Sequence, residues 1–221
     1  MIQRFLHDVP HTAKILEVGC ASGAFLKELR EKGYSDLWGV DVSEAAIRLC
    51  HERGLSNARL EDAAATTFVD ESFDVVISSD VLEHIENDKQ ALHEWQRVLK
   101  PQGKLILFVP AHPFLWSAHD VANHHIRRYK KKDLFLRLKA AGFTIKRVSY
   151  WDVVLFFPVA FARLVLNLIP STSQASNHKL HNLPFFVNKA ITLLLLTENV
   201  GLGAGINAPI GVSLFYIAQK S

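Results

Sequence analysis

Three short apolar runs in the first third of the chain each end in residues that could bind a nucleoside. The first run ends at Gly19 and Gly23, which lack a Cβ atom and so let the backbone approach a ligand closely. The second ends at Asp41, 18 residues after Gly23, where a carboxylate can accept hydrogen bonds from both hydroxyls of a ribose. The third ends at Asp62, which can accept from an exocyclic amine, and Ala63, which leaves room for a flat ring. We therefore predict a site for a cofactor that contains adenosine.

The spacing of the glycines argues against two common adenosine ligands. A dinucleotide fingerprint that starts at Gly19 needs glycines at the positions of Ala21 and Ala24. The chain also has no GxxxxGKS or GxxxxGKT phosphate loop. Tyr216 and Lys220 have a YxxxK spacing, but they lie in a strand-like run, and we interpret the spacing as chance. Neither a dinucleotide nor a nucleoside triphosphate is therefore favoured.

A second group of polar residues lies between Pro110 and Phe143 and could act on a substrate. The segment follows an apolar run, so we expect it to open at the same edge of the fold as the cofactor loop. Candidates for a general base are His119 and His125, and also His84, which follows the fourth predicted strand, because histidine titrates near neutral pH. The expected substrate-binding residues are His112, Trp116, Arg127, Arg128 and Tyr129.

Other interpretations of this polar segment stay open. Arg127 and Arg128 could clamp a phosphate or a carboxylate, but "RRYKKK" could equally be a solvated helix start beside hydrogen-bonded loop histidines. The histidines and Asp120 could ligate a metal ion. Their spacing, HxxxxxxHxxxxHH, matches no standard zinc pattern, so we expect no metal.

Short apolar runs alternate with amphipathic segments along most of the chain. Strands that alternate with helices indicate parallel βαβ units, so we predict an α/β fold with a doubly wound, mostly parallel sheet and helices on both faces. The carboxyl ends of parallel strands then share one edge of the sheet. The predicted helices cover residues 24–33, 43–54 and 87–100, and the predicted strands cover residues 14–19, 36–41, 58–63, 73–79, 103–110, 143–151 and 210–220.

The composition is that of a globular protein with an ordinary charge balance. A length of 221 residues with 49% hydrophobic residues suits one domain with an insertion, so we expect residues 1–221 to form a single domain. The 25 Lys and Arg residues exceed the 22 Asp and Glu residues by a net charge of +3, which is too small to indicate a nucleic-acid partner. Cys20 and Cys50 have no disulfide-framework spacing, and the N-terminus lacks the apolar core of a signal peptide. We therefore expect a cytoplasmic location.

Residues 152–205 form an apolar insertion before the last predicted strand. Val153–Ile169 and Leu183–Leu196 indicate two helices that are apolar nearly all round, apart from narrow polar stripes that include Arg163. The first run has 17 residues, which is the short limit for a bilayer span. The polar residues 171–182 between the two runs predict a loop. A lid over the substrate, a dimer interface and a membrane-facing helix pair remain three alternatives.

The sequence resembles the class I S-adenosylmethionine-dependent methyltransferases, particularly the small-molecule and lipid methyltransferases, over roughly residues 12–150. "ILEVGCASG" is similar to the family's first motif, "WGVDVS" to its second and "LKPQGKLILFVP" to its fifth strand, although Ala21 stands where the family most often has glycine. The resemblance implies a Rossmann-like sheet of seven strands and S-adenosylmethionine as the cofactor. It implies that the cofactor contacts Glu17, Gly19, Cys20, Ala21, Gly23, Asp41, Val42, Asp62, Ala63, Ser79 and Asp80.

The resemblance also implies a reaction, namely transfer of a methyl group to a small molecule or to a lipid-linked or glycan-linked acceptor. Displacement at a sulfonium requires the protein to hold nucleophile, methyl group and sulfur in line and to exclude water. "HHIRRY" is similar to a segment of methyltransferases in bacterial lipid and polysaccharide pathways. The alternative is an inactive methyltransferase-like module for binding or membrane docking. For the partners of the chain, two alternatives stay open: contact with the inner face of a membrane, and a second copy of the chain in a homodimer.

Overall fold

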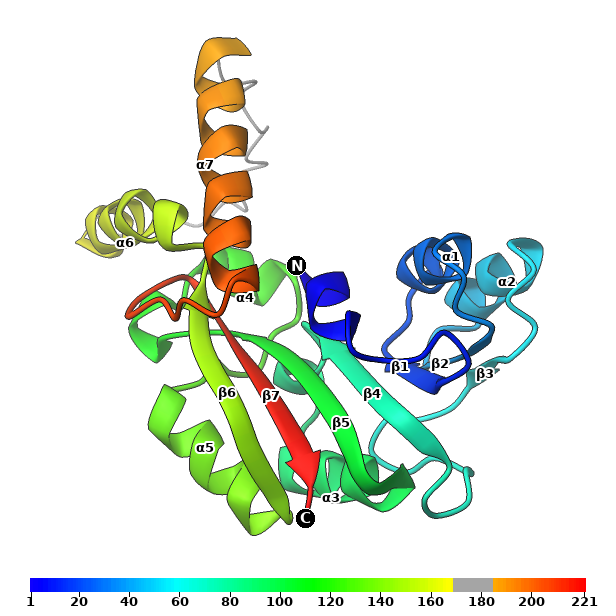
Figure 1. Cartoon of the computed structure of the whole chain (residues 1–221). Coiled ribbons are helices and arrows are strands. Elements are labelled where there is room, and N and C mark those ends of the chain that lie inside the picture. The colour runs from blue at the N-terminus through cyan, green and yellow to red at the C-terminus, as the bar shows by residue number, and fades with distance from the viewer. Residues whose placement is uncertain (169–184) are drawn as a thin grey trace.

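The sheet confirms the predicted fold class. The computed structural model describes residues 1–168 and 185–221 (Figure 1). Its strands are β1 (Lys14–Val18), β2 (Asp36–Asp41), β3 (Ala58–Leu60), β4 (Phe73–Ser79), β5 (Leu99–Pro110), β6 (Phe143–Trp151) and β7 (Ser213–Lys220). Within these residues the seven strands form one sheet in the order β3-β2-β1-β4-β5-β7-β6. Among the described strands only β7 runs in the opposite direction, so its pairs with β5 and β6 are antiparallel and all the other pairs are parallel.

Helices cover both faces of the sheet. Successive strand residues point to opposite faces, so Leu16 packs with residues of α3 (Asp88–Val98) and α5 (Lys131–Ala140), whereas Ile15 packs with residues of α1 (Ala24–Glu31) and α2 (Glu44–Glu52). Because both faces are buried, the strands are continuous apolar runs without polar alternation. This explains why the central strands stood out in the sequence.

Several predicted boundaries were wrong: β5 begins at Leu99 and not at residue 103, β7 begins at Ser213 and not at residue 210, and α1 and α2 are shorter than predicted. Two further boundaries differ for local reasons. β3 ends at Leu60, so Asp62 lies two residues beyond the strand and not at its last position. α3 ends at Val98 and not at Lys100, because Leu99 already pairs with Phe73 as the first residue of β5. Neither shift moves a predicted site residue to the other edge of the sheet.

Two apolar helices, α6 (Val153–Leu168) and α7 (Phe185–Gly203), lie between β6 and β7 in the chain. At the base of the two helices, α7 is hydrogen-bonded both to α6 and to the end of β6. The Val153 N–H of α6 donates to Glu198 Oε1 at 3.0 Å, and Trp151 Nε1 of β6 donates to Asn199 Oδ1 at 3.0 Å. From this base α7 extends away from the sheet (Figure 1). We refer to α6 and α7 as the helix pair.

The helix pair differs in length from the two predicted runs. α7 continues past Leu196 to Gly203, because Glu198 and Asn199 face the end of β6 and supply the bonds described above. The predicted loop 171–182 lies outside the described residues. Among the helices that are described, none combines the length and the apolar character needed to cross a bilayer.

Candidate functional site

The turn after β1 has a backbone conformation and a packing that require its two glycines. Gly19 and Gly23 both have positive φ angles, +69° and +70°, which favour glycine. A Cβ atom at Gly19 would lie 2.4 Å from Cγ2 of Val81. The Gly19 N–H donates to the Val40 carbonyl at 2.8 Å, which fixes the turn against the end of β2. The structure therefore requires glycine at these positions for internal packing and for the positive φ angles, and contact of the loop with a ligand stays a prediction.

Asp41 links the loop to the neighbouring strand. Its Oδ2 accepts a hydrogen bond from the Ala21 N–H at 2.9 Å, and its Oδ1 accepts one from the Ser43 N–H at 2.9 Å. Each carboxylate oxygen can accept a further bond, and the side chain is half-buried. The next residue, Val42, is exposed beside it. Asp41 thus stands at the rim of the cofactor loop and keeps accepting capacity for ligand hydroxyls.

Glu17 is a buried acid directly below this rim. The side chain is only 8% exposed, and its Oε2 has no hydrogen-bond partner among the described residues. Burial, together with the negative charge of Asp41, raises the pKa of Glu17 to about 8. An unpaired buried carboxyl oxygen suits a cationic ligand group, because the ligand would supply the missing partner. Cys20, the next predicted contact, is buried with its Sγ 3.9 Å from the Sγ of Cys50.

Asp62 and Ala63 lie beside Asp41 at the same edge of the sheet. The Glu61 N–H donates to the Asp41 carbonyl at 3.1 Å, which brings the residues after β3 next to the end of β2. Asp62 is exposed, whereas Ala63 is buried and its carbonyl accepts from Trp95 Nε1 at 2.8 Å. The structure therefore places the predicted adenine residues next to the predicted ribose residue.

Ser79 is the last residue of β4, the other neighbour of β1, and Asp80 follows it. Asp80 has a positive φ of 54°, and its N–H donates to the Phe108 carbonyl at 3.2 Å. Ser79 Oγ donates to Asp80 Oδ2 at 3.1 Å, and Asp80 is exposed. The predicted cofactor residues thus lie at or just beyond the carboxyl ends of β1, β2, β3 and β4, at one edge of the sheet. Their carboxylates and glycines fit a cofactor made of adenosine and a cationic amino acid.

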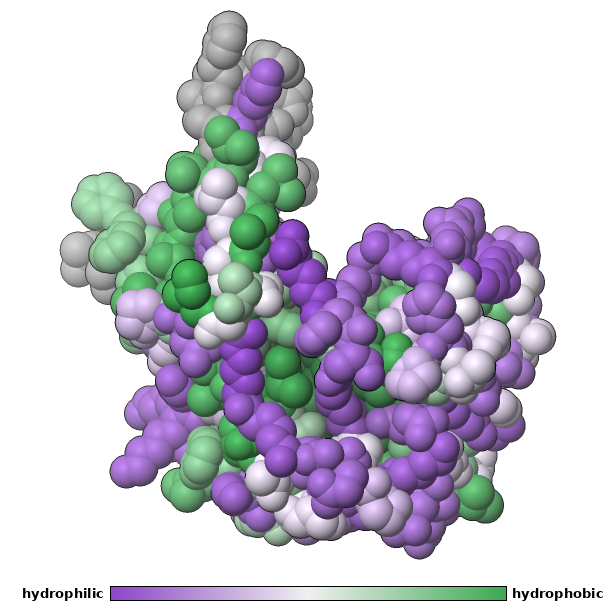
Figure 2. Space-filling view, in the orientation of Figure 1, coloured by the Kyte–Doolittle hydropathy of each residue, from purple (hydrophilic) through white to green (hydrophobic). Residues whose placement is uncertain are grey.

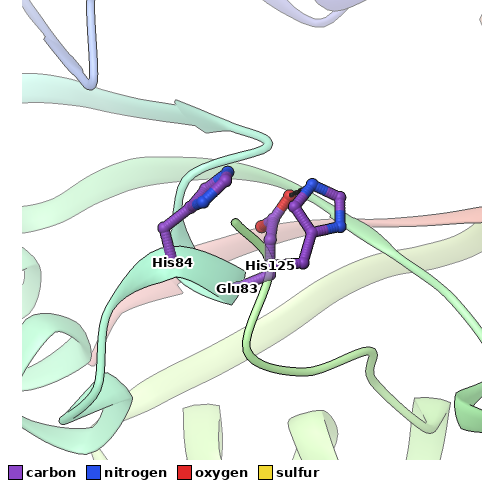
Figure 3. Close-up of side chains that lie close together, drawn as sticks. All are labelled: Glu83, His84 and His125. Atoms are coloured by element: carbon purple, nitrogen blue, oxygen red, sulfur yellow. Dashed lines mark ion pairs between the residues drawn. The ribbon is translucent and has the colours of Figure 1, made fainter. Parts of the chain in front are cut away.

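The structure brings together two of the three predicted bases. The rings of His84 and His125 lie 4.8 Å apart between centroids, and Figure 3 shows the Glu83 carboxylate directed toward His125. His119 is not part of this group: it is exposed on α4 (Ala118–Ala122), and its Nε2 pairs with Asn123 Nδ2 at 2.9 Å. His84 and His125 are therefore the better placed candidates.

Asp120 is the buried centre of the polar segment. Its Oδ1 accepts from Arg128 Nε at 2.6 Å and lies 3.0 Å from His125 Nδ1, and its Oδ2 accepts from the Ser117 N–H at 2.9 Å. Arg163 of α6 also reaches it, with Nη1 at 3.6 Å from Oδ2. Burial acts to raise the pKa of Asp120, but the bond and the charge of Arg128 outweigh it and hold the pKa below its usual range. Asp120 therefore orients His125 and joins the polar segment to the helix pair.

The predicted anion clamp is wrong for Arg128 and is not formed by Arg127. Arg128 is buried, and it donates to Asp120 and to the Ala111 carbonyl. Arg127 pairs with Asp88, with Nη1 at 3.0 Å from Oδ2. Tyr129 is buried too, and its hydroxyl donates to the same Asp88 oxygen at 3.0 Å. These side chains support the scaffold below the site, because their donors bind internal acceptors.

His112 and Trp116 lie at the base of the helix pair. The His112 ring stacks on Tyr150, with centroids 4.9 Å apart and an interplanar angle of 3°, and contacts Phe156 of α6. Burial lowers the pKa of His112. Trp116 is half-buried and follows a short 3-10 helix, Pro113–Leu115. Both remain available as substrate contacts.

Sequence analysis missed Glu83. The residue lies in a 3-10 helix, Leu82–His84, and its side chain is fully buried, with neither carboxyl oxygen hydrogen-bonded among the described residues. Burial, with a contribution from the charge of Asp80, raises the pKa of Glu83 to about 8. The only signal in the sequence was its place next to His84. Its burial could not be predicted, because the segment that covers it comes from residues some 40 positions later, where the Ile126 N–H donates to the Glu83 carbonyl.

Comparisons with known proteins agree with this geometry. Residues 16–107 match the family model described as a methyltransferase domain. An uncharacterised protein of Methanocaldococcus jannaschii is 32% identical over 137 residues, which cover 58% of this chain and 63% of the relative. The ubiquinone biosynthesis O-methyltransferase of Idiomarina loihiensis is 33% identical over 98 residues, which cover 42% of this chain and 40% of the relative. The chain thus spans less than two thirds of the length of these relatives.

A solved structure shows the same fold over nearly the whole chain. An S-adenosylmethionine-dependent methyltransferase from Archaeoglobus fulgidus superposes with a TM-score of 0.64 at 19% identity, covering 99% of this chain and 91% of that one. At this identity the likeness concerns the fold alone. The domain match and the residues at the strand ends add the cofactor, S-adenosylmethionine. Residues 16–107 therefore match a methyltransferase domain, and the fold over nearly the whole chain is that of an S-adenosylmethionine-dependent methyltransferase.

Proposed function

We propose that the chain transfers the methyl group of S-adenosylmethionine to a small-molecule acceptor. The observation that carries the proposal is the unpaired oxygen of buried Glu17 behind a glycine loop whose Ala21 N–H is bonded to Asp41. In this arrangement Glu17 would face the cationic amino-acid part, Asp41 would hold the ribose, and Asp62 with Ala63 would hold the adenine. The methyltransferase domain match over residues 16–107 supports the same assignment.

The residues around this site have tasks that follow from the reaction. When bound, the cofactor supplies a methyl group on a positively charged sulfur, and an acceptor atom displaces it in line. The chain must hold the acceptor in that line and keep water out. His84 and His125 lie after β4 and α4, on the side of the glycine loop where Val81 meets Gly19, and either could take a proton from a hydroxyl acceptor.

Calorimetric titration tests the proposal directly. We expect S-adenosylmethionine and S-adenosylhomocysteine to bind saturably, and NAD and ATP not to bind. Failure of both adenosyl ligands to bind at millimolar concentration would remove the proposed function. Binding without transfer to any acceptor in a screen of hydroxyl, amine and carbon nucleophiles would favour the inactive binding module.

For the acceptor we propose a lipid-linked molecule that carries a phosphate. The helix pair exposes large apolar side chains, among them Phe157 at 68% and Phe161 at 72%, and Figure 2 shows apolar surface along α7. Beside its base lies an open hollow of about 640 Å³, lined by His112, Pro113, Phe114, Lys130, Lys131, Lys132 and Tyr150. Lysines favour a phosphate and apolar helices favour an acyl or prenyl chain. The chain would then work at the cytoplasmic face of a membrane.

Vesicle flotation separates this acceptor class from a soluble one. We expect the protein to float with vesicles of phosphatidylglycerol and phosphatidylethanolamine, and the double variant Phe157→Asp/Phe161→Asp to lose this binding. Val69→Asp is the matched control, because Val69 is 75% exposed away from the helix pair. Absence of flotation of the wild type would contradict a membrane role, and equal flotation of all three proteins would contradict the role of the helix pair in membrane contact. A dimer in sedimentation velocity that the double variant abolishes would instead identify the helix pair as an interface between copies.

A further inference from the structure

Three side chains from two distant segments converge outside the predicted cofactor contacts. Glu83 and His84 follow β4, and His125 lies three residues after α4. One ligand atom from each of them lies within 4.8 Å of those of the other two (Figure 3). Two imidazoles and one carboxylate at such a spacing are a donor set that transition metals use in proteins.

The carboxylate of this group lacks a partner in the protein. Glu83 is 0% exposed, and neither Oε1 nor Oε2 has a hydrogen-bond partner among the described residues. Oε1 lies 3.9 Å from His125 Nε2, which is too long for a hydrogen bond but leaves room for an ion between the two atoms. A buried carboxylate is costly without a proton or a cation. A bound cation would supply the missing interactions.

Both histidines are held from behind, with one ring nitrogen left for a ligand. His125 Nδ1 lies 3.0 Å from Asp120 Oδ1, and His84 Nδ1 lies 3.2 Å from the His124 carbonyl. In both rings Nδ1–H can donate to these oxygens, so that Nε2 keeps its lone pair. Metal-binding histidines in proteins have this arrangement, with the second N–H bonded to a carboxylate or a backbone carbonyl.

The charges around the group favour a cation. Asp80 and Asp120 both act on Glu83 as negative charges, and the positive charge of Arg128 acts in the opposite sense. Arg128 is itself bonded to Asp120 at 2.6 Å, so the pair contributes little net charge. Glu83 and Asp80 then remain as uncompensated acids beside the two imidazoles.

We propose that Glu83, His84 and His125 bind one divalent transition-metal ion of the class of Zn²⁺, Mn²⁺ or Fe²⁺. The imidazoles disfavour Mg²⁺ and Ca²⁺, which prefer all-oxygen sites. Three protein ligands leave at least one coordination position open. This step rests on the proposed function: the open position would take an oxygen of the acceptor and lower the pKa of its hydroxyl. In the metal-bound chain this activation would replace proton abstraction by His84 or His125, because the ion would occupy Nε2 of both rings. Metal binding itself does not depend on methyl transfer.

Equilibrium dialysis with elemental analysis tests the site, and Co²⁺ serves as a spectroscopic probe. We expect the purified apo chain to bind about one Zn²⁺ per molecule and Co²⁺ to give the visible d–d bands of imidazole coordination. Glu83→Gln, His84→Ala and His125→Ala should each weaken Zn²⁺ binding by about 100-fold or more, and Asp120→Asn by about 10- to 100-fold through His125. His119→Ala, an exposed histidine on α4, is the control and should bind like the wild type.

The affinity for S-adenosylhomocysteine and the melting temperature show whether each variant is folded. A variant that binds S-adenosylhomocysteine normally but not Zn²⁺ supports the site. No saturable Zn²⁺ binding by the wild type, or equal loss in His119→Ala, would overturn it. Dialysis needs no acceptor, so the two proposals can fail separately. A chain that binds metal but transfers no methyl group would contradict the proposed function and still support the metal site.

Discussion

The Oδ2 atom of Asp41 accepts a 2.9 Å hydrogen bond from the backbone N–H of Ala21, so that the end of β2 holds the ligand loop after β1 in place. The same carboxylate is the proposed ribose acceptor, so in that proposal it would bind both the loop and the ligand.

Asp41→Asn should weaken the binding of S-adenosylhomocysteine by roughly 10- to 100-fold, because hydrogen bonds to a charged acceptor contribute about 1.5–3 kcal/mol each. Calorimetry measures the change. Glu44→Gln removes an exposed acid three residues further on and serves as the control, with no change expected. An Asp41→Asn protein of unchanged affinity would show that the ribose lies elsewhere.

Ala21→Gly should raise the free energy of unfolding by up to about 1 kcal/mol. Ala21 has a φ of 45°, in the left-handed region, where a Cβ atom costs about 1–2 kcal/mol, and the extra freedom of glycine in the unfolded chain offsets roughly 0.4–1 kcal/mol of that gain. Urea denaturation provides the measurement.

The opposite change in the same loop, Gly19→Ala, is the contrast to Ala21→Gly. It introduces a Cβ atom 2.4 Å from Val81 Cγ2 at a φ of +69°, so it should lower stability by about 2 kcal/mol or more. Val81→Ala in the same chain should recover part of this loss, since it removes the steric contact and leaves the φ strain. Equal stability of Gly19→Ala and the wild type would mean that the loop differs from the structure described.

Glu17→Gln should make the ligand-free protein more stable than the wild type, by an amount that grows as the pH rises toward 8. Folded Glu17 keeps its proton up to a pKa of about 8, whereas the unfolded chain loses it near 4.5. The folded state therefore binds more protons in this window, and the free energy of unfolding of the wild type falls with pH by up to about 1.4 kcal/mol per unit. Glutamine does not titrate, so this slope disappears.

Urea titrations at several pH values between 5 and 8 measure the Glu17→Gln effect. The exposed acid Glu31, changed to glutamine, should show no such divergence. Parallel pH profiles of wild type and Glu17→Gln would mean that Glu17 is ionised in the folded protein.

Arg128→Met should lower the free energy of unfolding by about 3 kcal/mol, because it leaves buried Asp120 without its 2.6 Å partner. Arg127→Met should cost less than about 1 kcal/mol, since Arg127 is nearer the surface and its partner Asp88 keeps its bonds from Arg137 and Tyr129. Chemical denaturation of both variants tests this order. A stable Arg128→Met protein with a raised KM for the acceptor would restore the substrate role expected from the sequence.

The cofactor edge could be predicted from the sequence because its residues follow regular strands. Gly19, Asp41 and Asp80 each come at or just after the end of a buried apolar run, and parallel pairing places those ends together. The polar segment was harder. Arg128 and His125 belong to a stretch whose contacts are made with Asp120 within it and with Glu83 far away, and no periodicity encodes such contacts.

The antiparallel strand β7 has a consequence for how the chain folds during synthesis. β7 follows every other strand in chain order, yet it pairs with β5 on one side and β6 on the other. Until it emerges from the ribosome, β5 and β6 each present an unpaired edge, and the apolar helix pair has already been made. Closure of the sheet is therefore a late step that joins residues about 110 positions apart, such as Phe108 and Phe215. Nascent chains stalled before β7 would be the species most in need of a chaperone.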